Sequence, residues 1–136
     1  MAKKKILIVD DHAETRLLVS ARLKKHHYDT VFAADAVQAI AVARQTQPDA
    51  IILDLGLPGG TGFIVLERLK ANALLSSVPV IILTADDTAE SEFKGLEAGA
   101  EVYLRKPVED EALVAAVASA VGAGAESAIT EPWLQQ

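Results

Sequence analysis

The sequence predicts an α/β fold in which a single, doubly wound sheet of five parallel strands carries helices on both faces. Short apolar runs, typical of buried parallel strands, alternate five times with segments whose apolar residues recur near a 3.6-residue spacing. The composition, 51% hydrophobic and 24% charged residues, fits a folded domain with an apolar core. Such regular alternation implies right-handed crossovers between parallel strands.

The elements follow in order from the apolar pattern. Strands are predicted over 5–9, 30–33, 50–53, 80–83 and 102–104. Between the strands and after the last one, apolar residues at helical spacing predict five helices. These residues are Leu18, Val19 and Leu23; Ala36, Ile40 and Ala43; Leu66, Leu69 and Ala73; Ala89, Phe93 and Leu96; and Leu113, Val117 and Val121.

Three helix starts are predicted from an acidic cap with a partner three residues later, the pattern of a capping box. The pairs are Asp11 with Glu14, Asp35 with Gln38, and Asp87 with Glu90. Pro48 and Pro79 stand where the second and third helices must already have ended, because proline disrupts a helix interior.

The length of 136 residues fits one domain, which we place at residues 1–121. Residues 122–136 are expected to form a tail or the start of a linker, because Gly122 weakens the last helix and Pro132 ends regular structure. Trp133, the single tryptophan, belongs either to a flexible or docked terminus or to an anchor for a partner.

The net charge of −6 argues against general nucleic-acid binding, which requires a basic face. The absence of cysteine excludes disulfides, thiolate metal sites and cysteine nucleophiles. The apolar stretches are far too short to cross a membrane or to form the core of a signal peptide. We therefore expect a cytoplasmic protein.

Polar side chains directly follow four of the predicted strands. Asp10 and Asp11 follow the first, Asp54 the third, Thr84 the fourth, and Lys106 lies just beyond the fifth. Because ligands in a doubly wound sheet bind outside the carboxyl ends of the strands, we expect these side chains to meet. Carboxylates about 4 Å apart repel each other by about 4 kcal/mol, so either a cation lies among them or they are partly protonated. Oxygen ligands favour a hard ion such as Mg²⁺.

This set of side chains can accept a phosphoryl group. A carboxylate such as Asp54 is a competent nucleophile toward phosphorus when a cation neutralises the incoming charge. Thr84 and Lys106 would then donate hydrogen bonds to the phosphoryl oxygens. The glycine-rich stretch after Asp54 is interpreted as backbone that approaches a metal closely, with Gly56 offering its carbonyl.

From about residue 4 to residue 121 the chain resembles the receiver domain of bacterial two-component response regulators. The resemblance is carried by residues 6–11, by Asp54 with Pro58 and Gly62 downstream, by residues 84–85, and by residues 103–107. It implies the flavodoxin-like strand order 2-1-3-4-5. It also implies that a sensor histidine kinase or a histidine phosphotransfer protein phosphorylates Asp54. Mg²⁺ would be held by Asp11, Asp54 and the Gly56 carbonyl, with Asp10 acting through water.

The same resemblance implies how the phosphoryl group would be held and read. Thr84 and Lys106 would hold it, and the bond between Lys106 and Pro107 would be cis. As Thr84 moves toward the phosphate, Tyr103 would turn inward and change the surface of the fourth helix, fifth strand and fifth helix. That surface would control a downstream protein partner or form a homodimer. The protein would catalyse only its own phosphorylation and dephosphorylation, and would be no metabolic enzyme.

Some features leave alternatives open. Gly56 lacks the polar side chain that many receivers carry, and Asp86 lies two residues after Thr84; in the family these positions tune phosphate lifetime. The main alternative is a phosphorylation-deficient, receiver-like interaction module. A hydrolase of the haloacid dehalogenase type would need Asp at position 56, and a flavodoxin would need a hydroxyl-rich loop after the first strand. His12 is interpreted as a solvent-facing residue of the first helical turn or as a modulator of the acid pair.

Overall fold

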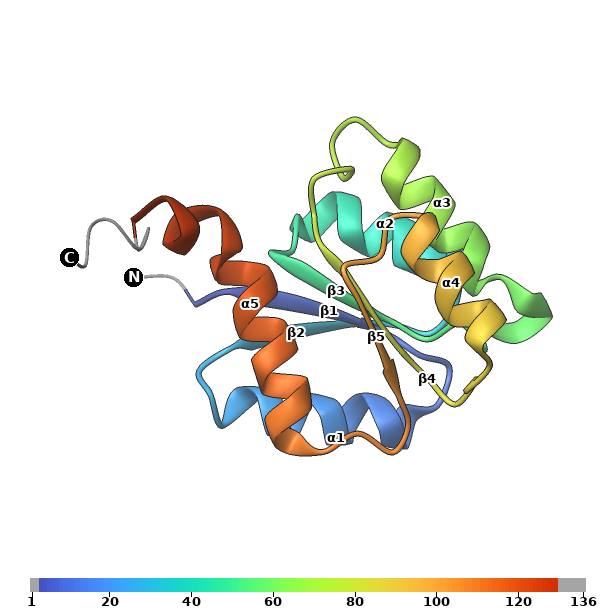
Figure 1. The fold of residues 1–136 in the computed structure, drawn as a ribbon, viewed down its shortest axis with the longest axis horizontal. Helices are drawn as coiled ribbons and strands as arrows, with labels where there is room; N and C mark the ends of the chain where they lie inside the picture. The colour runs from blue at the N-terminus through green and yellow to red at the C-terminus, as the bar shows by residue number, and fades with distance from the viewer. Residues whose placement is uncertain (1–2, 130–136) are drawn as a thin grey trace.

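The polar strand ends are brought together by a five-stranded parallel sheet in the order β2-β1-β3-β4-β5 (Figure 1). A computed structural model describes residues 3–129 of the chain. The strands are β1 (Lys5–Val9), β2 (Asp29–Ala33), β3 (Ala50–Leu53), β4 (Val80–Thr84) and β5 (Val102–Arg105). The helices are α1 (Ala13–Lys24), α2 (Ala36–Thr46), the short η1 (Pro58–Gly60), α3 (Gly62–Ala71), α4 (Ala89–Glu97) and α5 (Asp110–Ile129). The predicted fold class and strand order are confirmed.

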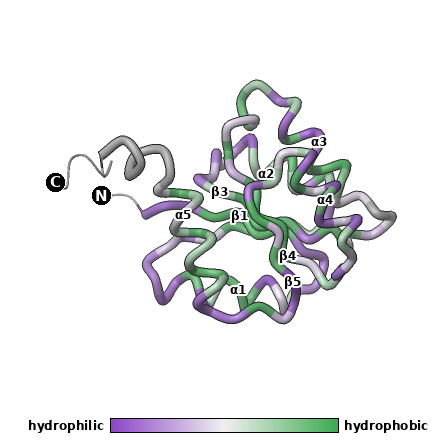
Figure 2. The backbone as a smooth tube through the Cα atoms, viewed as in Figure 1, coloured by the Kyte–Doolittle hydropathy of each residue, from purple (hydrophilic) through white to green (hydrophobic). Residues whose placement is uncertain are grey.

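The sheet separates two apolar cores, and each core is closed by helices on one face. On one face, Val19 and Leu23 of α1 and Leu113 of α5 pack against every second residue of the strands. In β1 these strand residues are Ile6 and Ile8. On the other face, α2 and α3 pack against the strand residues that lie between those positions. Figure 2 shows the hydrophobic colouring concentrated in the central strands and the hydrophilic colouring on the outer turns. Burial of both faces explains why the strands are continuous apolar runs.

Strand register fixes which polar residues become neighbours at the carboxyl edge. Val9 of β1 pairs with Leu53 of β3, so that Asp10 and Asp54 leave the sheet side by side. The Asp54 amide still donates to the Val9 carbonyl oxygen over 3.0 Å. On β4 and β5, the Lys106 amide donates to the Thr84 carbonyl oxygen over 2.8 Å. The backbone hydrogen bonds of the sheet therefore continue to Asp54 and Lys106, the first residues after β3 and β5.

The capping predictions met different outcomes. At α2 the prediction is confirmed, because the Asp35 carboxylate accepts a 2.8 Å hydrogen bond from the Gln38 amide. At α1 it is wrong: His12 is the N-cap residue, without a side-chain cap bond, and the preceding Asp11 carboxylate joins a cluster of acids instead.

At α4 the capping prediction is wrong by one residue. Thr88, rather than Asp87, occupies the N-cap, and its hydroxyl accepts from the Ser91 amide. The Asp86 carboxylate binds the Thr88 amide over 3.0 Å and delays the first helical residue to Ala89. The side chain of Asp86, two residues before the N-cap, therefore supports the turn from which this helix begins.

The last helix is longer than the glycine pattern suggests. Helix α5 passes through Gly122 and ends at Ile129, so this glycine does not terminate it. The expectations for Pro132 and Trp133 lie outside the described residues. Within residues 3–129, no helix combines the length and apolarity needed to cross a membrane.

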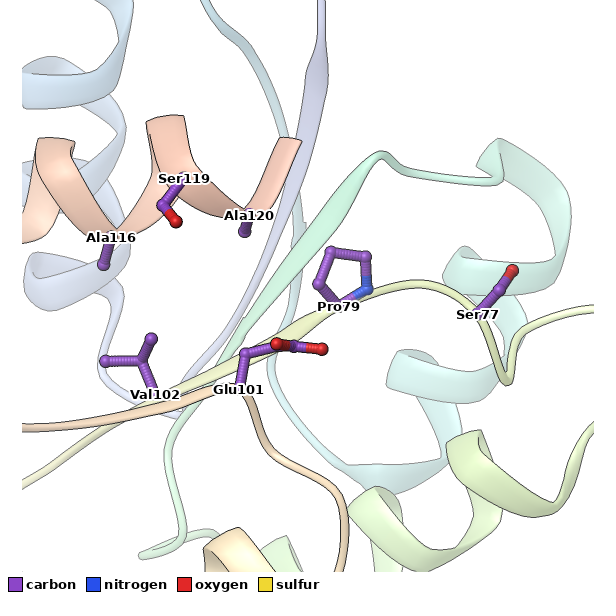
Figure 3. Close-up of a pocket in the computed structure, with 7 residues that line it drawn as sticks. All are labelled: Ser77, Pro79, Glu101, Val102, Ala116, Ser119 and Ala120. Atoms are coloured by element: carbon purple, nitrogen blue, oxygen red, sulfur yellow. The ribbon is translucent and has the colours of Figure 1, made fainter. Parts of the chain in front are cut away.

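A cavity of about 290 Å³ lies at the opposite edge of the sheet from the acids (Figure 3). It is lined by Pro79 just before β4, by Glu101 just before β5, and by Ala116 and Ala120 on α5. Small side chains on the helix leave this space open. Its position at the amino ends of β4 and β5 separates it from the polar strand ends.

Candidate functional site

Three of the predicted site residues are buried polar groups at the carboxyl edge of the sheet. Asp10 is 3% exposed, Asp54 5% and Thr84 1%. Each lies at or directly after the end of a central strand, where the backbone is fixed by the ladder. Because burying a charged or polar group is costly without a partner, each of these side chains must be accounted for by its neighbours.

The acids form one tight cluster. Asp10, Asp11, His12 and Asp54 each offer a ligand atom, and these atoms lie within 4.8 Å of one another. Asp10 Oδ1 accepts a 2.9 Å hydrogen bond from the His12 amide. Among the described residues, the buried Asp11 Oδ1 has no hydrogen-bond partner. An orphaned carboxylate oxygen inside an acid cluster is the arrangement that a cation would complete.

Lys106 supplies positive charge to the cluster. Its Nζ donates to Asp10 Oδ2 over 2.7 Å and to Asp54 Oδ2 over 3.0 Å. Burial lowers the pKa of Lys106, but the hydrogen bonds and charges of the two acids outweigh it, so the pKa lies above its ordinary value. The ammonium is therefore charged at neutral pH and joins two acids whose positions are 96 and 52 residues distant in sequence.

Asp54 is held as a carboxylate. Burial raises its pKa, but the hydrogen bond from the Gly56 amide, the contact with Lys106 and the Thr84 hydroxyl together lower the pKa below its ordinary value. The Gly56 amide donates to Asp54 Oδ1 over 2.9 Å, while Lys106 binds Oδ2. Both oxygens are thus fixed in direction, and the group is ionised across the physiological pH range.

The loop after β3 is shaped by close backbone contacts. A Cβ at position 62 would lie 2.4 Å from Leu55 Cα and 2.8 Å from the Asp54 carbonyl oxygen, so Gly62 permits the start of α3 to touch this loop. A Cβ at position 56 would lie 3.4 Å from Asp54 Oδ1. The Gly56 amide faces the acid, whereas the role predicted for its carbonyl as a metal ligand stays a prediction.

Tyr103 lies apart from the acids, in the core beneath α4. Its side chain is buried, and its hydroxyl donates to the Asp86 carbonyl oxygen over 2.7 Å. Burial raises the pKa of Tyr103, and the nearby charge of Asp86 adds to this effect. The ring is therefore already turned inward. The peptide bond between Lys106 and Pro107 is cis.

Asp86 is directed away from Asp54 and toward α4. Its carboxylate accepts from the Thr88 hydroxyl over 2.8 Å and from the Ser91 hydroxyl over 2.6 Å. The hydrogen bonds from Ser91 and Thr88 lower its pKa. Its own amide, however, donates to Thr84 Oγ1 over 3.3 Å. Asp86 therefore connects the buried threonine to both α4 and Tyr103.

Two further residues lie near the acids: His12, for which the sequence left open a solvent-facing position or a modulating role, and Arg16, which was not predicted. His12, which is 68% exposed on its side chain, places Nδ1 3.2 Å from an oxygen of Asp10 and 3.2 Å from an oxygen of Asp11. Arg16 donates from its guanidinium to the Asp10 carbonyl oxygen over 2.7 Å. For His12, adjacency to the acid pair was a usable signal. For Arg16, the sequence offers nothing that separates it from an ordinary exposed arginine of α1.

The donor set fits Mg²⁺. Carboxylate oxygens dominate it, one of them is buried without a partner, and the cluster opens to solvent at Asp11, whose side chain is 29% exposed. Magnesium retains waters and takes few protein carboxylates, so a partly open site suits it. The geometry can therefore combine a cation, an ionised nucleophile and two phosphoryl-binding donors.

Comparisons with known proteins agree with this geometry. The family model described as the response regulator receiver domain matches residues 6–118. Protein PilH of Pseudomonas aeruginosa is 38% identical over 120 residues, which cover 88% of this chain and 98% of that protein. The phosphate regulon transcriptional regulatory protein PhoB of the same organism is 40% identical over 115 residues, which cover 85% of this chain and 50% of PhoB.

The chain spans about half the length of PhoB and a smaller share, 25%, of the response regulator PleD of Caulobacter vibrioides. Among solved structures, a putative response regulator from Chloroflexus aurantiacus superposes with a TM-score of 0.83 at 32% identity, covering 88% of this chain and 98% of that one. The chemotaxis protein CheY4 of Vibrio cholerae gives a TM-score of 0.79 at 32% identity, covering 85% and 97% respectively.

Proposed function

This chain belongs to the response regulator receiver domain family, and from that premise we propose that Asp54 accepts a phosphoryl group from a sensor histidine kinase or a histidine phosphotransfer protein. The observation that carries the proposal is the position of Lys106 Nζ, 2.7 Å from Asp10 and 3.0 Å from Asp54. An ammonium that already contacts the Asp54 carboxylate is well placed to bind an oxygen of a phosphoryl group transferred to Asp54.

The chain's own groups account for most of the chemistry. The Asp54 carboxylate, ionised because of its lowered pKa, attacks phosphorus. The bond between phosphorus and the donor atom breaks, and its electron pair leaves with the donor. Lys106 and the buried Thr84 hydroxyl then donate to the transferred oxygens. Mg²⁺, which we expect to be held by Asp11, Asp54 and the Gly56 carbonyl with Asp10 acting through water, would offset the charge of the incoming group.

We expect phosphorylation to be read on the surface formed by α4, β5 and α5. Thr84 Oγ1 accepts from the Asp86 amide, and the Asp86 carbonyl accepts from the Tyr103 hydroxyl. A Thr84 hydroxyl drawn toward a phosphoryl oxygen therefore loses or shifts its contact with Asp86. A shift of Asp86 in turn changes the hydrogen bond that holds the inward-turned Tyr103. The two states differ in contacts with the phosphoryl group, which is what a population shift requires.

A protein partner is the proposed target of this surface. Phe93 on α4 is 69% exposed and Leu96 is 42% exposed, while Glu92 of α4 forms an ion pair with Arg105 of β5. Apolar side chains rimmed by charges are typical of a protein-binding surface. We propose that either a downstream effector or a second copy of the chain binds there.

The proposal is tested by intact-mass measurement after incubation with acetyl phosphate and Mg²⁺. We expect one phosphoryl adduct on the wild-type chain, none on Asp54→Asn, and none when the metal is chelated. Asp29→Asn is the matched control, because Asp29 is exposed at the opposite edge of the sheet. An adduct that persists on Asp54→Asn, or none on the wild type, would overturn the assignment of Asp54.

A further inference from the structure

His12 is the member of the acid cluster to which the phosphotransfer chemistry gives no role. It is the N-cap residue of α1, with extended backbone angles, and its amide is tied to Asp10 Oδ1 over 2.9 Å. The residue is therefore anchored to the acids through its backbone. Its side chain is 68% exposed, so apolar packing does not explain where the ring lies.

The imidazole nevertheless turns toward the acids. Nδ1 lies 3.2 Å from Asp10 Oδ1 and 3.2 Å from Asp11 Oδ1. Asp11 Oδ1 is also the buried oxygen that has no hydrogen-bond partner among the described residues. One ring nitrogen and this orphaned oxygen thus face the same space, together with ligand atoms from Asp10 and Asp54 that lie within 4.8 Å of both.

We propose, on the basis of the proposed function, that His12 Nδ1 becomes a direct ligand when the acid cluster binds a divalent transition-metal ion in place of Mg²⁺. The site is then a mixed site of carboxylate oxygens and one nitrogen. Imidazole binds the later first-row ions well, whereas Mg²⁺ favours oxygen ligands. His12 therefore makes the site select Co²⁺ or Zn²⁺, and to a smaller degree Mn²⁺, over Mg²⁺ more strongly than three acids alone would.

Exposure and anchoring together allow this selection. The backbone of His12 is fixed beside the acids, and its largely exposed ring is held only by the contacts of Nδ1 with Asp10 and Asp11. With Mg²⁺, the carboxylates bind the ion and the ring stays free. With a softer ion, the ring adds a bond, at the cost of ordering one side chain. The cation present thus decides whether the side chain of His12, the N-cap residue of α1, is bound together with the acids.

Electron spin echo measurements on bound Mn²⁺ test the proposal, because a coordinated imidazole produces a ¹⁴N modulation that carboxylates do not. We expect this modulation in the wild type and its loss in His12→Gln. His26→Gln is the matched control, since His26 is an exposed histidine beyond the other end of α1 and should leave the signal intact. No modulation in the wild type, or modulation that survives in His12→Gln, would refute direct coordination.

Calorimetric titration supplies a second, independent measurement. At mildly alkaline pH, where an imidazole is neutral, His12→Gln should weaken Co²⁺ binding about tenfold or more. The loss for Mg²⁺ should be clearly smaller. Equal losses for both ions would mean that His12 acts only on the shape or charge of the site, which contradicts the proposal.

The two proposals fail in different ways. If acetyl phosphate gives no adduct on Asp54 in the wild type, the phosphoacceptor function fails, whatever the metal measurements show. If the adduct forms but bound Mn²⁺ shows no nitrogen modulation, only the role of His12 fails. Neither metal measurement requires a phosphoryl group, so each can be read on the protein alone.

Discussion

At the scale of single residues, the site depends on how its charges are balanced. The cluster contains three carboxylates, and the Lys106 ammonium contacts two of them and offsets part of their negative charge. The Asp54 carboxylate is further held by the Gly56 amide. Breaking a buried ion pair on one side leaves an uncompensated charge, which is more costly than the pair itself is favourable. Lys106, which we propose as a phosphoryl-binding group, is thus also a structural one.

Lys106→Met should therefore lower the free energy of unfolding by about 1–3 kcal/mol when metal is absent, a range reduced because Lys106 retains some contact with solvent. Added Mg²⁺ should recover part of this loss, because it supplies positive charge to the same acids. Urea unfolding with chelator and with Mg²⁺ measures both effects. A loss of the same size with and without Mg²⁺ would show that Lys106 contributes through packing rather than charge.

The same pair predicts how stability depends on pH. The pKa of Asp54 is lowered on folding, so its contribution is present above its unfolded value, about pH 4, and is lost as pH falls. The pKa of Lys106 is raised, so its contribution is present below its unfolded value, about pH 10, and is lost as pH rises through the folded pKa. The stability difference between wild type and Lys106→Met should be flat between these limits and shrink outside them. A difference that changes steeply near neutral pH would contradict this pairing.

Gly56 offers a test of phosphate lifetime. A Cβ there would lie 3.4 Å from Asp54 Oδ1, so a larger side chain at this position stands directly beside the acceptor carboxylate. We expect Gly56→Asn to change the rate of dephosphorylation, through its effect on water at the phosphoryl group, while phosphorylation still occurs. Loss of the adduct followed by intact mass measures the lifetime. An unchanged lifetime would remove position 56 from the control of hydrolysis.

At the scale of elements, the β3–α3 loop shows how backbone packing sets the position of the acceptor. The start of α3 touches the loop at Gly62, whereas a Cβ at Gly59, where φ is 73°, would meet only Thr61 Cγ2 at an ordinary 3.7 Å. The two glycines are therefore required for different reasons. One avoids a backbone collision, and the other adopts a left-handed conformation that disfavours a side chain.

This difference predicts unequal effects of alanine. Gly59→Ala should cost about 1 kcal/mol of unfolding free energy, from its positive φ. Gly62→Ala should cost more, about 3 kcal/mol. Its Cβ would collide with backbone atoms of Leu55, which can move only if the whole loop moves. The substitution should also reduce phosphorylation of Asp54 by displacing the loop. Equal destabilisation of the two variants in urea unfolding would show that contact at Gly62 is relieved by a small shift.

At the scale of the whole molecule, one sheet edge collects residues from across the chain. Asp10, Asp54 and Thr84 are adjacent because β1, β3 and β4 are neighbouring parallel strands that end together. The two faces of the sheet then have separate uses. The face covered by α1 and α5 closes one core, while the other holds Tyr103 under α4 and connects the acids with the outer surface through Asp86.

Much of this arrangement is predictable from the sequence, for physical reasons that also mark the limit. Strands buried on both faces are apolar runs, so β1 and β3 are predicted to the residue, and polar residues after them must share an edge. The strand order came from the family resemblance, because periodicity does not fix neighbours. The sequence left the contact of His12 with the acids as one of two interpretations and did not predict the cap at Thr88, since both depend on how a loop directs individual side chains.

The last prediction concerns the oligomeric state. If the surface of α4 and β5 pairs with its own copy, beryllofluoride with Mg²⁺ should convert a monomer into a two-fold symmetric dimer in sedimentation velocity. Phe93→Asp should abolish the dimer, because it puts a charge at the centre of the apolar surface. Val37→Asp is the matched control: Val37 on α2 is 77% exposed but lies on a different helix, so its variant should still dimerise. A monomer in every state would contradict pairing of this surface with its own copy.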